Sequence, residues 1–182
     1  MDGLLFASER IVQRSWEIAG DELGIPHMGD VIYHTLGMNR AGRNEYFRKY
    51  IREDFPFEEF GKLTRDNFWK IVDKEGLPLK KGAKELLAYG KSQGYKMAVA
   101  TSSSREYAMG NLIRAGIDSY FDSVVCGDMV KKAKPDPEIY QKASESLRIP
   151  PEYCMAFEDA PGGILSAHQA GMKVIMVPDL VQ

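Results

Sequence analysis

The sequence predicts an α/β protein with a parallel sheet and an all-helical insertion near its N-terminus. Two observations predict this class. From Ser8 to about Lys80 the apolar residues follow a helical spacing and no strand is needed. After Pro78, short apolar runs alternate with helical stretches of about ten to fifteen residues, which is typical of βαβ units.

The N-terminal half is predicted to contain only helices. The first begins at Ser8, a favourable N-cap residue, and ends at Gly24, a residue type that often terminates helices. Two further helices are predicted, over residues 40–53 and 57–75. Gly76 and Pro78 close the last of them.

The C-terminal half alternates between the two kinds of element. Helices are predicted over 82–93, 105–115, 137–147 and 162–170. Strands are predicted at the apolar runs 97–100, 124–126, 154–157 and 174–177. This order assigns residues 1–7 and 81–182 to the α/β core and residues 8–80 to the helical insertion.

Composition limits the classes of partner. The chain has 182 residues, 44% of them hydrophobic, and a formal net charge of −2. That balance argues against nucleic-acid and anionic-membrane partners, and no apolar run reaches membrane-spanning length. Cys126 and Cys154 lie in apolar runs, which favours buried thiols in a reducing compartment. We expect a cytoplasmic monomer with a small-molecule partner.

Polar residues follow the predicted strands at the edge where parallel sheets bind ligands. Thr101, Ser102 and Ser103 follow the first apolar run, and Glu158 and Asp159 follow the third. The two acids suit Mg²⁺, although acids before a helix are also favoured by the helix dipole.

The hydroxyl residues and one lysine are candidates for phosphate binding. Thr101 and Ser102 could hold a phosphate at a helix start, or the segment could simply cap that helix. Lys134 lies in a lysine-rich loop stiffened by Pro135 and Pro137, where it could offset phosphoryl charge or remain solvated like its neighbours.

Four segments in this order resemble the motifs of haloacid dehalogenase-like hydrolases. They are MDGLLF at residues 1–6, Ala100-Thr101-Ser102, Lys134-Pro135-x-Pro137 and Phe157-Glu158-Asp159-Ala160. The resemblance covers essentially the whole chain. It is to the subgroup with a small helical cap, which includes β-phosphoglucomutases and sugar phosphatases.

The resemblance implies a Rossmann-like core, Mg²⁺ and an aspartyl-phosphate intermediate. Asp2 would be the general acid/base, and Lys134 would offset charge on the nucleophile and the phosphate. Thr101 and Ser102 would bind the phosphate, and Glu158 and Asp159 would bind Mg²⁺. Arg40 would bind an anionic part of the substrate. Arg40 ends a stretch, Leu36-Gly37-Met38-Asn39-Arg40, that resembles a cap loop; an exposed arginine at a helix start is the alternative.

The resemblance also places the nucleophilic aspartate two residues before Asp2, directly before Met1, at the end of a first core strand. Neither that residue nor that strand is in the sequence. Three explanations remain open: the sequence is part of a longer protein, the chain is a non-catalytic relative, or another chain supplies the strand.

The expected function is therefore a Mg²⁺-dependent phosphatase acting on a small phosphorylated metabolite, with a sugar phosphate as the expected substrate. One alternative is a hexose-phosphate mutase. Val12 stands where β-phosphoglucomutases carry a cap-hinge histidine, which favours the phosphatase. The alternative from another class is a non-catalytic phosphate-binding protein.

Overall fold

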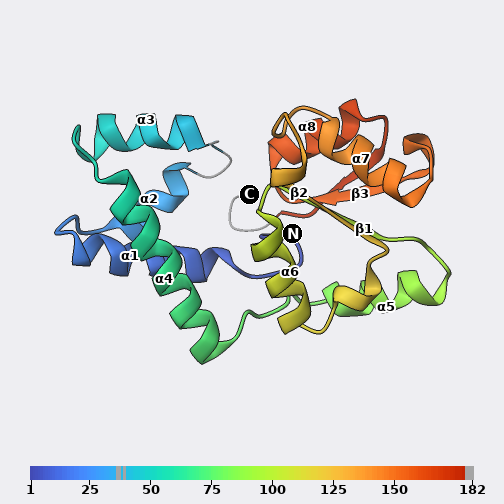
Figure 1. The fold of residues 1–182 in the computed structure, drawn as a ribbon, viewed down its shortest axis with the longest axis horizontal. Coiled ribbons are helices and arrows are strands. Elements are labelled where there is room, and N and C mark those ends of the chain that lie inside the picture. The colour runs from blue at the N-terminus through green and yellow to red at the C-terminus, as the bar shows by residue number, and fades with distance from the viewer. Residues whose placement is uncertain (36–37, 39, 179–182) are drawn as a thin grey trace. The chain divides into compact units, whose positions relative to one another are not determined.

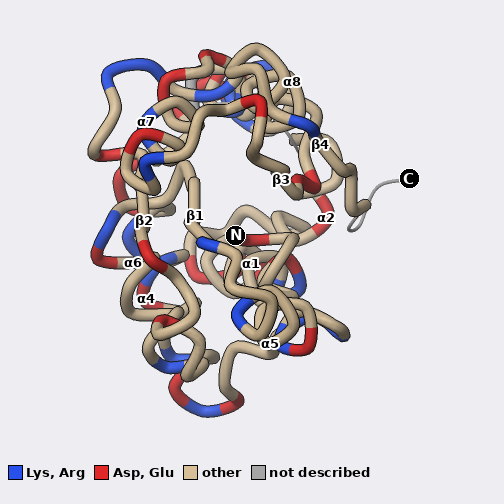
Figure 2. The backbone as a smooth tube through the Cα atoms, turned by 90° about the vertical axis from the view of Figure 1, so that its right-hand side faces the viewer, with Lys and Arg blue, Asp and Glu red and all other residues tan. Residues whose placement is uncertain are grey.

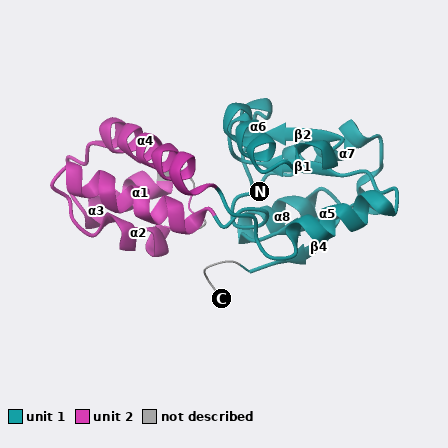
Figure 3. Ribbon diagram, turned by 90° about the horizontal axis from the view of Figure 1, so that it is seen from below, with its two compact units in different colours: residues 1–7, 77–180, 182 teal, residues 8–76, 181 magenta. Residues whose placement is uncertain are grey.

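The computed structural model describes residues 1–35, 38 and 40–178, and the chain divides into two compact units (Figure 3). One unit comprises residues 1–7 and the described part of 77–180, and the other comprises residues 8–76. Among the described residues, no helix is both long enough and apolar enough to cross a membrane.

Among its described residues, the helical unit contains four helices (Figure 1): α1 Glu9–Glu22, α2 Met28–Thr35, α3 Arg40–Tyr50 and α4 Phe57–Glu75. Helix α1 packs against both α2 and α4. Its Trp16 meets Phe47 and Phe60 edge-on, with ring centroids 5.6 and 5.7 Å away. These aromatic contacts form the centre of the hydrophobic core of this unit.

The sequence did not predict α2 as a separate helix. Its first turn is held by Glu17 of α1, whose carboxylate accepts a hydrogen bond of 2.7 Å from the Gly29 N–H. Ser8 was expected to cap α1, but its side chain makes no capping bond and instead donates to the Glu9 carboxylate. Helix α3 ends at Tyr50, before the predicted boundary at residue 53.

The α/β unit contains four strands and four α-helices among its described residues. In chain order they are α5 Ala83–Ser92, β1 Ala98–Thr101, α6 Arg105–Arg114, β2 Ser123–Cys126, α7 Glu138–Leu147, β3 Met155–Glu158, α8 Pro161–Gln169 and β4 Lys173–Met176. Three short 3₁₀ helices, η1 Asp118–Tyr120, η2 Gly127–Met129 and η3 Pro151–Tyr153, were not predicted. All four predicted strands are present, with boundaries within one residue of those expected.

The four strands form two parallel pairs. Strand β1 pairs with β2, with Thr101 opposite Cys126, and β3 pairs with β4, with Glu158 opposite Met176. Helix α7 packs on β1 and β2, α8 packs on β3 and β4, and the two helices contact each other. Apolar residues from all four strands and both helices join in one buried cluster. The predicted α/β class is confirmed, with two short parallel sheets in place of one.

The first six residues form a compact turn in the α/β unit. The N–H groups of Leu4 and Leu5 donate to the carbonyl oxygen of Met1, and buried Phe6 bridges Leu79 in antiparallel fashion. The ammonium group of Lys80 donates to the Gly3 carbonyl oxygen at 2.7 Å. These bonds hold the backbone of Asp2 against the segment that leads into α5.

Candidate active site

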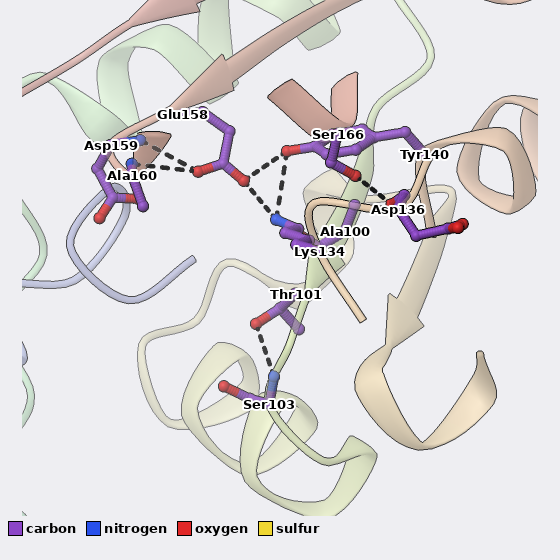
Figure 4. Close-up of polar contacts among 10 residues, drawn as sticks. All are labelled: Ala100, Thr101, Ser103, Lys134, Asp136, Tyr140, Glu158, Asp159, Ala160 and Ser166. Atoms are coloured by element: carbon purple, nitrogen blue, oxygen red, sulfur yellow. Dashed lines mark hydrogen bonds and ion pairs between the residues drawn. The ribbon is translucent and has the colours of Figure 1, made fainter. Parts of the chain in front are cut away.

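A buried ion pair lies where β3 ends. The Glu158 side chain is 6% exposed and the Lys134 side chain 13%. The Lys134 ammonium donates to Glu158 Oε1 and also to the Ala100 carbonyl oxygen of β1, 3.2 Å away (Figure 4). The Tyr140 hydroxyl of α7 donates to the same Oε1 at 2.5 Å. Lys134 thus connects the ends of β1 and β3.

The second oxygen of Glu158 faces the start of α8. Oε2 accepts from the N–H of Asp159 at 3.2 Å and from that of Ala160 at 3.5 Å. Gly163 lies directly against this carboxylate, and a Cβ atom there would overlap all three carboxyl atoms. The glycine therefore makes room for the buried acid.

The charges of the pair hold Glu158 in its ionised form. Burial alone would raise the pKa of this carboxyl, but the charge and hydrogen bond of Lys134 and the hydroxyl of Tyr140 together keep that pKa below its ordinary value. Burial and the neighbouring Glu158 charge raise the pKa of Tyr140. Tyr140 is therefore a neutral donor to a carboxylate.

The loop after β1 is tightly folded. Thr101 is buried at the strand end, and its Oγ1 accepts a hydrogen bond of 3.2 Å from the Ser103 N–H. Ser104, rather than Thr101, caps α6 by accepting from the Tyr107 N–H. Ser102 is exposed, and its carbonyl oxygen lies so close to Gly127 that a Cβ atom there would overlap it. The capping alternative for Thr101 is therefore wrong.

Asp2 joins this loop through its side chain. Its Oδ2 accepts from the Ser103 hydroxyl at 2.9 Å, and its Oδ1 accepts from the Tyr107 hydroxyl at 3.1 Å. Through Ser103, the carboxylate of Asp2 is linked to the Thr101 side chain.

Most of the predicted site residues lie in this one network of the α/β unit. Hydrogen bonds or chain adjacency connect Asp2, Thr101, Ser102, Lys134, Glu158 and Asp159. The remaining candidate, Arg40, is the first residue of α3, and its side chain lies outside the described residues, as do Leu36, Gly37 and Asn39.

The sequence analysis missed Tyr107, Tyr140 and Gly163. Tyr140 has an apolar helical spacing that predicts a core position, and it does pack in the core, but its hydroxyl also reaches Glu158. The acids that accept hydrogen bonds from the hydroxyls of Tyr140 and Tyr107 lie 18 and 105 positions away in sequence, so no local pattern could identify these contacts.

The donor set at the end of β3 suits a hard cation. Asp159 adds a second carboxylate directly after the buried Glu158, and Mg²⁺ is usually held by one or two carboxylates, with waters and substrate oxygens completing its shell. Within the described ranges, no group of three or more acidic, histidine or cysteine side chains is placed to hold a metal.

Comparison with known proteins gives consistent matches. The family model of the haloacid dehalogenase-like hydrolases matches residues 1–177. The chain is 32% identical over 175 residues to the phosphorylated carbohydrates phosphatase of Thermotoga maritima, covering 96% of this chain and 81% of that protein. It is 40% identical over 174 residues to the validoxylamine A 7'-phosphate phosphatase of Streptomyces hygroscopicus subsp. limoneus, covering 94% and 80%.

A solved structure has the same fold. CbbY from Rhodobacter sphaeroides, in complex with xylulose-(1,5)bisphosphate, superposes with a TM-score of 0.80 at 25% identity, covering 99% of this chain and 84% of that one. The ordered motifs, the α/β unit with its helical insertion, and a family match over almost the whole chain agree. The chain belongs to the haloacid dehalogenase-like hydrolases and is assigned with them as an enzyme.

Proposed function

We propose that this protein is a Mg²⁺-dependent phosphatase of a small phosphorylated metabolite, with a sugar phosphate as its substrate. The observation that carries the proposal is the network joining Asp2, Thr101, Lys134 and Glu158 at the carboxyl ends of β1 and β3. The names of the similar phosphatases, which act on phosphorylated carbohydrates and on validoxylamine A 7'-phosphate, support this substrate class.

Each residue has a distinct role in this proposal. Thr101 and Ser102 hold the phosphate through hydroxyl and backbone groups, and Lys134 offsets the charge that the phosphate and nucleophile bring together. Glu158 and Asp159 hold Mg²⁺, which supplies further charge neutralisation at the phosphate oxygens when bound. Asp2 protonates the leaving oxygen and later accepts a proton from water.

The proposed nucleophile is an aspartate directly before Met1 in the polypeptide, outside the printed sequence. This proposal rests on the resemblance of MDGLLF at residues 1–6 to the first motif of the family. Its attack on phosphorus would form an aspartyl-phosphate, which water then hydrolyses.

The helical unit is proposed to act as a cap that closes over the substrate and excludes water. Arg40, at the start of α3, is proposed to bind an anionic part of the substrate. The protein is proposed to act in the cytoplasm as a monomer; its two cysteines, Cys126 and Cys154, are free thiols, as expected in a reducing compartment.

The first test is to establish the residue before Met1, by reading the coding sequence upstream and measuring the intact mass of the native protein. The native polypeptide is then assayed for inorganic phosphate release from a panel of sugar phosphates, with Mg²⁺ and with a chelator. We expect Mg²⁺-dependent release, reduced about 10²- to 10⁴-fold by Asp2→Asn.

The outcomes separate the candidate functions. Accumulation of an isomeric sugar phosphate instead of inorganic phosphate would establish the mutase. Binding of a phosphate analogue without turnover, in a native chain that begins at Met1, would establish a non-catalytic phosphate-binding protein and contradict the proposal.

A further inference from the structure

Two hydroxyl groups from one segment occupy both oxygens of the Asp2 carboxylate. Ser103 donates to Oδ2 at 2.9 Å and Tyr107 donates to Oδ1 at 3.1 Å. Ser103 belongs to the loop after β1, and Tyr107 lies in the first turn of α6. A carboxylate bound at both oxygens has its plane and its direction set by its partners.

The rest of the chain holds both ends of this contact in place. The N–H of Tyr107 is bonded to the Ser104 side chain, and the Tyr107 ring packs against the buried cluster that includes Phe6 and Leu112. On the other side, the turn over residues 1–6 fixes the Asp2 backbone through hydrogen bonds to the Met1 carbonyl oxygen. Tyr107 is therefore held in a position from which it can act on the orientation of Asp2.

We propose that Tyr107 is a positioning residue for Asp2, aiming this carboxyl group and stabilising the charge that it gains during the reaction; this rests on the proposed function. When the phosphorus–oxygen bond of the substrate breaks, its electron pair goes to the leaving oxygen. That oxygen takes the proton of the Asp2 carboxyl. Asp2 becomes a carboxylate that accepts hydrogen bonds from Tyr107 and Ser103, and Tyr107 keeps its own proton throughout.

The chemistry supplies a test that a purely structural role of Tyr107 would not satisfy. A sugar phosphate has an alkoxide leaving group that needs the proton from Asp2, whereas p-nitrophenyl phosphate releases a stable phenolate without it. Tyr107→Phe keeps the ring in the core and removes only the hydroxyl. In single turnovers of the native polypeptide we expect the rate at which the sugar phosphate releases its alcohol to fall about 10- to 100-fold, the scale of one hydrogen bond to a charged group.

For p-nitrophenyl phosphate, the single-turnover rate of p-nitrophenol release should fall less than about 3-fold, since this leaving group needs no proton and the release precedes the step in which Asp2 accepts a proton from water. KM for the sugar phosphate should stay unchanged. Tyr120→Phe is the matched control: Tyr120 packs against the same cluster, but its ring contacts Lys91. It should leave both rates unchanged. Equal losses on the two phosphates, or no loss on either, would overturn the proposal.

A second measurement needs no turnover. Asp2→Ala, Tyr107→Phe and the double variant are made in the native polypeptide, and their free energies of unfolding are compared in urea. A direct contact predicts that the two effects do not add. Additive effects would overturn the inference. If the native wild type lacks phosphatase activity while the effects remain non-additive, the proposed function fails and the positioning role with it, but the contact stands.

Discussion

Two lysines of the same loop, Lys132 and Lys134, have different environments: Lys132 is exposed to solvent, whereas Lys134 is buried in an ion pair with Glu158. Lys132, two positions away, is 73% exposed and pairs with Asp136 at 3.5 Å. Lys134 instead lies against Ala100, Tyr140 and Glu158, with a side chain only 13% exposed. Removing one partner of a buried ion pair leaves the other charge without compensation.

Lys134→Met is therefore predicted to lower the free energy of unfolding by about 3–5 kcal/mol, measured by urea denaturation. Lys132→Met, the matched control, should change it by less than about 1 kcal/mol. Adding Glu158→Gln to Lys134→Met should restore part of the loss because the uncompensated charge is gone. A loss near that of the control would show that the Lys134–Glu158 pair does not stabilise the fold.

Helix α8 shows how an element is shaped by the site that it borders. Gly162 and Gly163 are adjacent in its first turn. A Cβ atom on Gly162 would meet nothing within 4 Å, whereas one on Gly163 would overlap the Glu158 carboxylate. Packing therefore requires glycine at position 163 but not at position 162.

Gly162→Ala and Gly163→Ala should therefore have opposite effects on thermal stability. Alanine is favoured over glycine in a helix by up to about 1 kcal/mol, so Gly162→Ala should raise the melting temperature. Gly163→Ala should destabilise by about 1–3 kcal/mol because the Glu158 side chain must move. Similar shifts for both variants would show that Glu158 can be displaced freely.

The loop before α7 is held by an acid at the start of that helix. The N–H of Lys131, the ammonium of Lys142 and the N–H of Lys132 all bond Glu138 and lower its pKa from 4.5 to about 2. A carboxyl group whose pKa is lower in the folded than in the unfolded protein stabilises the folded state at pH values above its unfolded pKa. This stabilisation is lost as the pH falls through the pKa of the folded state.

Glu138→Gln should thus lower stability at pH 7, and the difference from the wild type should shrink as the pH falls from 4.5 towards 2. Urea denaturation at a series of pH values measures this. Glu152→Gln, at an exposed position before β3, is the control for loss of a surface carboxylate. A difference that stays constant with pH would contradict the role assigned to the Glu138 charge.

At the scale of the whole molecule, the chain has separate hydrophobic cores in its two units. The helical unit packs around Trp16, and the α/β unit has two clusters, one including Leu112 and the other Ala156. Acidic and basic residues are interspersed along the described chain (Figure 2), which fits the small net charge. Separate cores predict that each unit can open on its own.

Trp16→Ala should cost about 3–5 kcal/mol within the helical unit. Hydrogen exchange measured by mass spectrometry should then accelerate in α1, α2 and α4, while β1–β4 keep their protection. Leu112→Ala, a change at a fully buried position of α6, should accelerate exchange in the α/β unit and leave the protection of α1, α2 and α4 unchanged. Equal acceleration in both units by either change would show that the two cores unfold together.

The sequence by itself determined the class of the fold and the alternation of elements, and it named most of the residues that the structure connects in the candidate site. Periodicity, helix-ending glycines and strand-end positions are local properties, and they place Thr101 and Glu158 correctly at the ends of β1 and β3. Helix α2 was missed because it has only 8 residues and is completed by Glu17 from another helix. The prediction that Ser8 caps α1 was wrong because the Ser8 hydroxyl donates to the Glu9 carboxylate instead.

Only the tertiary structure decided which side chains meet. The Tyr107–Asp2 contact joins residues 105 positions apart, and Lys134 reaches Glu158 across 24. The need for glycine at position 163 appears only when the Glu158 carboxylate is in place. Such contacts depend on how strands and helices pack, and packing joins segments whose separation in sequence carries no local signal.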